Sequence, residues 1–167
     1  MKYIFGTLLF FMSAVISLSV SAQSFTIPEL PSTKEEFVKS EQDFINAANW
    51  LEKTTITSDT KNRTLVNAYV TAWVINSPTV TIEMRSSILK AFDKNAQLLP
   101  VFLAGYSRYC LQNNYSKDEL KCNVAGLKAV INCYNLGGEL KKDKALLKVI
   151  DKDNEGKLEE WVQDAMK

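Results

Sequence analysis

Apolar residues recur three or four positions apart along most of the chain after residue 33, and this helical spacing is the feature that most limits the fold. In residues 34–53 the spacing places four side chains on one helix face: Phe37, Phe44, Ala48 and Leu51. Residues 79–82 are β-branched and favour an extended backbone, but no second run can pair with them to form a sheet. The sequence therefore predicts an all-α protein.

Capping residues and prolines divide the pattern into about seven predicted helices. These cover residues 34–53, 61–76, 83–94, 98–112, 116–134, 143–150 and 157–166. Thr33 with Glu36, and Ser116 with Glu119, match the capping box, and Pro100 fits the first turn of a helix, where a missing N–H costs nothing. We expect an irregular helical bundle of about six to seven helices built from helical hairpins, with a tetratricopeptide-like stack as the alternative.

The predicted helix 116–134 is apolar on two opposite faces. One face carries large residues: Leu120, Val124, Leu127, Ile131 and Tyr134. The other carries small ones: Cys122, Ala125, Ala129 and Cys133. A helix of this kind is normally buried between neighbours, and the small residues allow a second helix to approach closely.

Residues 1–22 have the three parts of a cleavable signal peptide. Lys2 is the basic start, an apolar run extends to Val20, and Ala22 ends a small-residue cleavage site. There is no cysteine near this exit, so the sequence predicts an exported protein, periplasmic or extracellular, that is not a lipoprotein and has no stable membrane insertion after cleavage. With two prolines and no helical period, residues 23–33 should form an extended N-terminal arm, followed by a single helical domain at 34–167.

The charge is nearly balanced, with 20 Lys and Arg residues against 19 Asp and Glu residues. A balanced chain has no overall field to attract nucleic acid, so we expect no nucleic-acid partner. The partner is instead expected to be an envelope protein or a small ligand.

Three cysteines in an exported chain raise the question of a disulfide. Cys122 and Cys133 lie on one helix too far apart to bond, and Cys133 is at the far end of the hairpin from Cys110. Only Cys110 and Cys122, which flank the same predicted turn, are placed for a disulfide. The alternative is three buried thiols that act as small apolar residues.

The chain contains no histidine. This removes the Ser-His-Asp and Cys-His catalytic groups and histidine-ligated zinc, and no glycine-rich phosphate loop is present. A histidine-free hydrolase with two carboxylates, acting on envelope polysaccharide, stays open. The adjacent acids Glu35/Glu36 and Glu159/Glu160 point about 100° apart on a helix, so they do not identify such a site.

One segment, beginning at Asp151, is similar to the start of an EF-hand calcium loop. Its candidate oxygen ligands are Asp151, Asp153, Glu155 and Glu159, with Gly156 at the bend. Position 12 is Val162, where the motif needs a bidentate glutamate. The sequence therefore predicts at most a weak calcium site, and the alternative is a polar turn. We expect no other cofactor.

Several segments together resemble those of small exported helical proteins of Bacteroidota. They are residues 72–81, the Leu103-Ala104-Gly105-Tyr106 stretch and Gly156-Lys157-Leu158. The resemblance implies a bacterial envelope setting and transfers no catalytic or binding residue. Taken together, the sequence favours an exported, non-catalytic interaction or ligand-binding module over an enzyme, with the carboxylate hydrolase and the calcium-stabilised module as alternatives.

Overall fold

The computed structural model describes residues 25–167, and the predicted signal peptide lies outside the described residues. The described part is all-α, with eight α-helices and one 3₁₀-helix. They are α1 (Lys34–Lys39), α2 (Glu41–Lys53), α3 (Thr60–Asn76), α4 (Ser86–Leu89), η1 (Asp93–Leu98), α5 (Leu99–Gln112), α6 (Glu119–Asn135), α7 (Lys144–Asn154) and α8 (Leu158–Ala165). The all-α prediction is confirmed.

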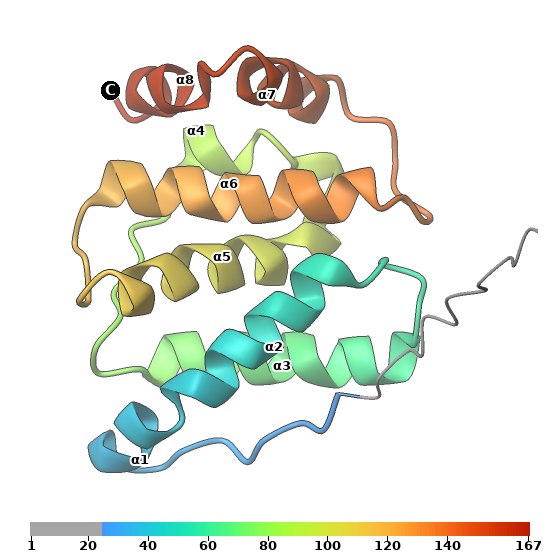
Figure 1. Cartoon of the computed structure of the whole chain (residues 1–167). Helices are drawn as coiled ribbons and strands as arrows, with labels where there is room; N and C mark the ends of the chain where they lie inside the picture. Colours follow the sequence, from blue (N-terminus) through green and yellow to red (C-terminus); the bar gives the residue numbers. More distant parts are fainter. Residues whose placement is uncertain (1–24) are drawn as a thin grey trace, which may run out of the picture.

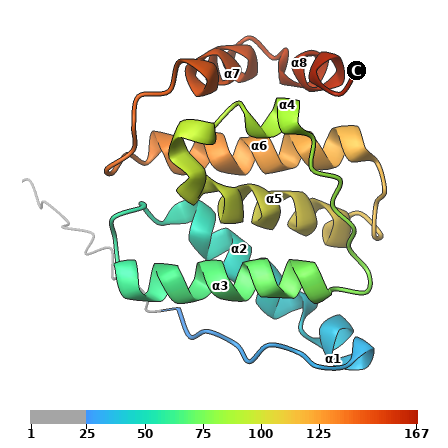
Figure 2. The same cartoon turned by 180° about the vertical axis from the view of Figure 1, so that it is seen from behind.

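The helices are arranged around the α5–α6 hairpin. Figures 1 and 2 show α5 and α6 side by side in the middle, with α2 and α3 on one side of the pair and α7 and α8 on the other. The hairpins α2–α3, α5–α6 and α7–α8 differ in length, and α4 and η1 interrupt their order. The arrangement fits the irregular bundle better than a tetratricopeptide-like stack.

The helix α6 is buried on both of its predicted apolar faces, at Cys122, Ala129 and Cys133 on one and at Leu127 and Ile131 on the other. Its small residues face α5, where an ideal Cβ added to Gly105 would lie 2.5 Å from the Cβ of Ala129. A Cβ on Gly126 would lie 2.7 Å from the ring of Phe102. The two helices approach so closely that glycine is required at both contacts.

A cluster of aromatic side chains lies on the α2–α3 side of the α5–α6 hairpin. Trp73 of α3 is fully buried, and its ring stacks on Phe44 of α2 at a centroid distance of 4.2 Å. The arm at residues 25–33 has no helix or strand and packs Phe25 against Trp50. One continuous hydrophobic core joins α1–α3 to α5–α8.

Two predicted helices are interrupted. The helix predicted at 34–53 breaks at Ser40, whose hydroxyl donates to the carbonyl of Phe37 and accepts from the indole N–H of Trp73, each at 2.9 Å. A serine that bonds to the backbone in this way competes with the helical ladder. The helix predicted at 83–94 is reduced to the single turn α4, because Arg85 is extended and the chain turns at residues 90–92 before η1 begins.

Two predicted boundaries are also wrong. The N-cap of α6 is Asp118, whose carboxylate accepts from the N–H of Lys121, so Ser116 lies outside the helix. The helix predicted at 143–150 does not end at Ile150 but continues, as α7, to Asn154. By contrast, the capping box of Thr33 with Glu36 is confirmed.

Candidate functional site

The segment between α3 and α4 is extended and places alternate side chains on opposite sides. Val80 is buried and Ile82 packs against the core, so both face inward. Thr79, Thr81 and Glu83 face the other way. The hydroxyl of Ser77 accepts from the N–H groups of Thr79 and Val80 at 3.3 and 3.2 Å, which holds the start of the segment in place.

These outward side chains form one side of a pocket of about 330 Å³. The full lining is Thr79, Thr81, Glu83, Tyr106, Tyr115, Ser116, Lys117 and Glu119, and we refer to it as the 79–83 pocket. Its volume is at the lower end of the range for small-molecule sites, about 300–1,000 Å³. Five of its eight lining side chains carry a hydroxyl group.

The opposite side of the pocket is the turn between α5 and α6. Asn114 and Tyr115 both have φ of +55°, the left-handed region that side-chain-bearing residues rarely adopt. Such strain is kept only where the surroundings enforce it, and it is common at ligand-binding sites. The turn leaves the ring of Tyr115 half-exposed, and its hydroxyl donates to Glu41 at 3.2 Å.

Glu41, in the first turn of α2, connects the two sides of the pocket. One of its carboxylate oxygens accepts from Tyr115, and the other accepts from the hydroxyl of Thr79 at 3.4 Å. The bond to Glu41 raises the pKa of Tyr115. Glu41 therefore fixes both hydroxyl groups without itself lining the pocket.

Tyr106 of α5 is almost fully buried at the base of the pocket. Burial raises the pKa of Tyr106 well above its usual range, and the neighbouring thiols of Cys122 and Cys110 add to the shift. Its phenol is thus a neutral hydrogen-bonding group at physiological pH.

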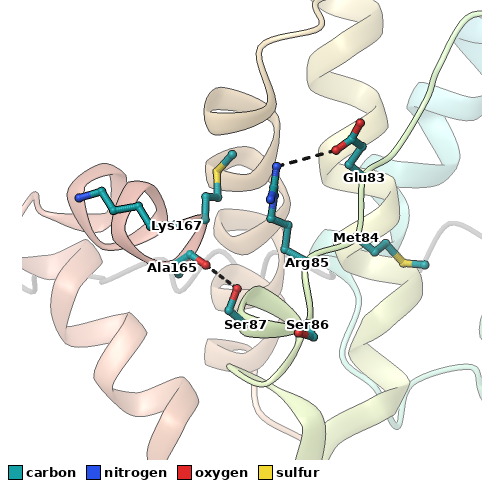
Figure 3. A pocket seen from close by; sticks show the side chains of 8 residues that line it. Glu83, Met84, Arg85, Ser86, Ser87, Ala165 and Lys167 are labelled. Atoms are coloured by element: carbon teal, nitrogen blue, oxygen red, sulfur yellow. Dashed lines mark hydrogen bonds and ion pairs between the residues drawn. The ribbon is translucent and has the colours of Figure 1, made fainter.

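Arg85 links the pocket to the neighbouring surface. Its Nη2 atom lies 2.9 Å from Glu119 and 3.8 Å from Glu83, and the hydrogen bond to Glu119 raises the pKa of Arg85. Figure 3 shows a second, more open pocket, which shares Glu83 with the 79–83 pocket and is lined by residues 83–87 and 165–167. There the side chain of Met84 points away from the Arg85–Glu83 pair.

The four predicted calcium ligands do not converge. Asp151 and Asp153 lie within α7, Glu155 pairs with Lys152 and Lys157 at 3.2 and 3.1 Å, and Glu159 pairs with Lys121 at 2.7 Å. Within residues 25–167 no group of three or more Cys, Asp or Glu side chains is placed to hold a metal ion. Gly156 does supply a tight bend, with φ of +71°. The weak calcium site stays a prediction of the sequence.

The predicted cysteine pair is brought together. The sulfur atoms of Cys110 and Cys122 lie 3.2 Å apart, both are buried, and both are free thiols in this structure. Cys133 lies elsewhere, with its sulfur 3.4 Å from the guanidinium of Arg63. The structure therefore separates one close pair from one isolated thiol.

Four lysine residues that no sequence pattern predicts as a group come together where α7 meets the segment of α4 and η1. They are Lys90, Lys94, Lys144 and Lys148, which line a pocket of about 450 Å³ together with Asp93, Asp143 and Ala145. The buried amide of Asn95 joins η1 to the segment before α7, because it donates to the carbonyl of Lys141 and accepts from its N–H at 2.9 and 2.8 Å. A chain with balanced charge thus carries a local basic surface that its composition does not reveal.

The 79–83 pocket was not predicted from the sequence either, although the alternation of Thr79-Val80-Thr81-Ile82-Glu83 is a signal of an extended segment with one polar side.

No helix among residues 25–167 is both long and apolar enough to cross a bilayer. Comparison of the chain with protein-family models, curated proteins and solved structures found no match.

Proposed function

We propose that the chain is an exported, non-catalytic module that binds a small hydroxyl-rich ligand of the saccharide type in the 79–83 pocket. The observation that carries the proposal is the pocket lining, in which hydroxyl groups from the extended segment face a half-exposed tyrosine on a strained turn. Hydroxyl groups both donate and accept hydrogen bonds, and an aromatic ring offers an apolar surface beside them. Saccharides present the same combination of hydroxyl groups and C–H surfaces.

Binding rather than catalysis is favoured by the contacts of the two glutamates of the pocket with Arg85. Glu83 and Glu119 contact the same Arg85 nitrogen, at 3.8 and 2.9 Å. The absence of histidine from the sequence leaves no ordinary proton shuttle to act beside them. What the pocket offers a ligand is a set of hydrogen-bonding groups held in place by their neighbours.

Titration of the purified protein with a saccharide panel, followed by calorimetry, tests this proposal. Thr79→Val and Thr81→Val remove one hydroxyl each at nearly constant shape, and each should weaken binding about 3- to 10-fold, the effect of one lost hydrogen bond. Thr64→Val is the matched control, because Thr64 is exposed on α3 and does not line the pocket. No saccharide binding, or equal affinity in all three variants, would overturn the proposal.

A histidine-free carboxylate hydrolase is the second candidate, and the presence of two glutamates in one pocket favours it. Both contact one Arg85 nitrogen, so their oxygens lie close together. Paired acids in glycosidases are about 5–9.5 Å apart. If the protein only binds, a saccharide incubated with it is recovered intact. Cleavage that is lost in both Glu83→Gln and Glu119→Gln would favour the hydrolase instead.

Export is a separate part of the proposal and rests on the features of residues 1–22. Cell fractionation and N-terminal sequencing of the protein from its own source test it. We expect a periplasmic or extracellular product that begins at Gln23. Recovery of the uncleaved chain from the cytoplasm would overturn it.

A further inference from the structure

The α5–α6 turn that forms one side of the 79–83 pocket is closed at its base by two cysteines. Cys110 lies in the last turn of α5 and Cys122 in the first turn of α6, with their sulfur atoms 3.2 Å apart. We propose that Cys110 and Cys122 form a thiol–disulfide site whose oxidised form fixes this turn. The effect on ligand binding rests on the proposed function, whereas the bond itself does not.

The turn has strain that a covalent closure would help to hold. Between the two cysteines, Asn114 and Tyr115 both adopt φ of +55°. The reduced turn is held by a few hydrogen bonds, including the one from the N–H of Ser116 to the carbonyl of Cys110 at 3.1 Å. A bond between positions 12 apart restricts the open forms of this short loop, so the left-handed residues have fewer alternatives.

The exchange has two steps, and either cysteine can begin it once the turn is open and the contact between the two thiols is broken. With Cys122 as the attacking thiolate, its sulfur attacks one sulfur of an external disulfide and releases a thiolate. Cys110 then loses its proton and attacks the mixed disulfide at Cys122, which releases a second thiolate. The external disulfide is reduced to two thiols and the protein dithiol is oxidised.

Both cysteines are buried, so the exchange takes place while the hairpin is open, during folding or after transient opening of the turn. The oxidant is a low-molecular-weight disulfide or a disulfide-bearing redox protein, which are the oxidants of export compartments. The isolated Cys133 has no thiol neighbour among the described residues and serves as an internal control.

The test is refolding of the full chain with oxidised glutathione, followed by alkylation, intact mass measurement and peptide mapping. Before alkylation, wild type and Cys133→Ser should each be about 2 Da lighter than the reduced chain by loss of two hydrogens, with Cys110 joined to Cys122. After alkylation, wild type should carry one alkyl group, on Cys133, and Cys133→Ser should carry none. Cys110→Ser and Cys122→Ser should not form this intrachain bond. Two alkylatable thiols in oxidised Cys133→Ser, or a bond that includes Cys133 in wild type, would overturn the proposal.

Two further measurements separate the bond from its consequence. Amide hydrogen exchange at residues 113–117 should be slower, by about 10-fold or more, in the oxidised than in the reduced protein. Unchanged exchange with the bond present would show that the disulfide does not fix the turn. Saccharide affinity should be higher in the oxidised form. If the bond forms and slows exchange but no saccharide binds, the proposed function fails and the inference about the turn stands.

Discussion

Gly105 of α5 lies so close to Ala129 of α6 that a β-carbon on the glycine would come within 2.5 Å of the alanine Cβ. The same added carbon would lie 2.9 Å from the backbone oxygen of Ala125, which cannot move without shifting α6. This contact sets the spacing of the central hairpin, on which both the pocket and the cysteine pair depend.

The first prediction concerns this contact. In an ordinary helix interior Gly→Ala stabilises by about 1 kcal/mol, but Gly105→Ala should destabilise by about 2 kcal/mol because overpacking outweighs the helix propensity. Urea denaturation measures the change. The double variant Gly105→Ala/Ala129→Gly removes one of the two clashing carbons and should recover part of the loss. A stabilised Gly105→Ala protein would contradict the close approach of the helices.

The second prediction distinguishes the two candidate N-caps of α6. The carboxylate of Asp118 accepts from the N–H of Lys121 at 3.0 Å, whereas the hydroxyl of Ser116 accepts from the N–H of Asp118 at 3.2 Å, which lies before the helix. Asp118→Ala should therefore cost about 1 kcal/mol, the usual value of a lost cap. Ser116→Ala should cost about 0.5 kcal/mol or less. Thermal denaturation of both variants measures the difference, and a larger loss for Ser116→Ala would restore the capping box predicted from the sequence.

The third prediction concerns Arg63, which is only 3% exposed. Its guanidinium donates to the carbonyls of Thr54 and Leu51 at 2.7 and 3.2 Å and so completes the C-terminal end of α2. Arg63→Met would remove both of these bonds and leave the carbonyl of Thr54 only the weak thiol donor of Cys133 at 3.9 Å, and we expect a loss of about 3 kcal/mol in the free energy of unfolding. Lys61→Met, an exposed change on the same helix, should alter it by about 0.5 kcal/mol or less.

The fourth prediction is a pH dependence in the alkaline range. Burial, with a smaller effect from Asp43, raises the pKa of Tyr69 from 10.0 to about 12. The folded state thus holds the phenol proton more tightly than the unfolded state. The contribution of Tyr69 to the free energy of unfolding is therefore fully present below pH 10 and is lost as the pH rises towards 12.

Denaturation of wild type and Tyr69→Phe between pH 8 and about pH 11 measures this effect. The hydroxyl of Tyr69 has no hydrogen-bond partner among residues 25–167, so the variant should differ little from wild type at pH 8. Its stability should fall less steeply above pH 10, although Tyr106 contributes in the same direction. Identical alkaline profiles in the two proteins would contradict the assignment.

Much of the fold was predictable because its signals are local. Helical spacing of Phe44, Ala48 and Leu51, the capping box at Thr33 and the position of Pro100 depend on residues within one or two turns of each other. The errors occur where a distant residue competes with the local pattern. For example, the helix breaks at Ser40, whose hydroxyl accepts a hydrogen bond from the indole N–H of Trp73, 33 positions away.

The candidate site was predictable only in part. The prediction that Cys110 and Cys122 are placed as a pair follows from the length of one turn, and their sulfur atoms are indeed adjacent. The 79–83 pocket was not predictable, because Thr79, Tyr115 and Glu119 belong to separate segments and no motif relates them. Likewise, the calcium-like spacing could not show that Asp151 and Asp153 would lie inside a helix.

The sequence by itself determined the all-α class, the approximate helices and the two apolar faces of α6, because side-chain size and polarity at helical spacing act over a few residues. The tertiary structure alone decided where helices break, which carboxylates meet lysines or Arg85, and which hydroxyl groups share a pocket. Those features depend on contacts between residues far apart in the chain. These contacts form, and contribute to stability, only after the packing of α5 against α6 has set the distances between the segments.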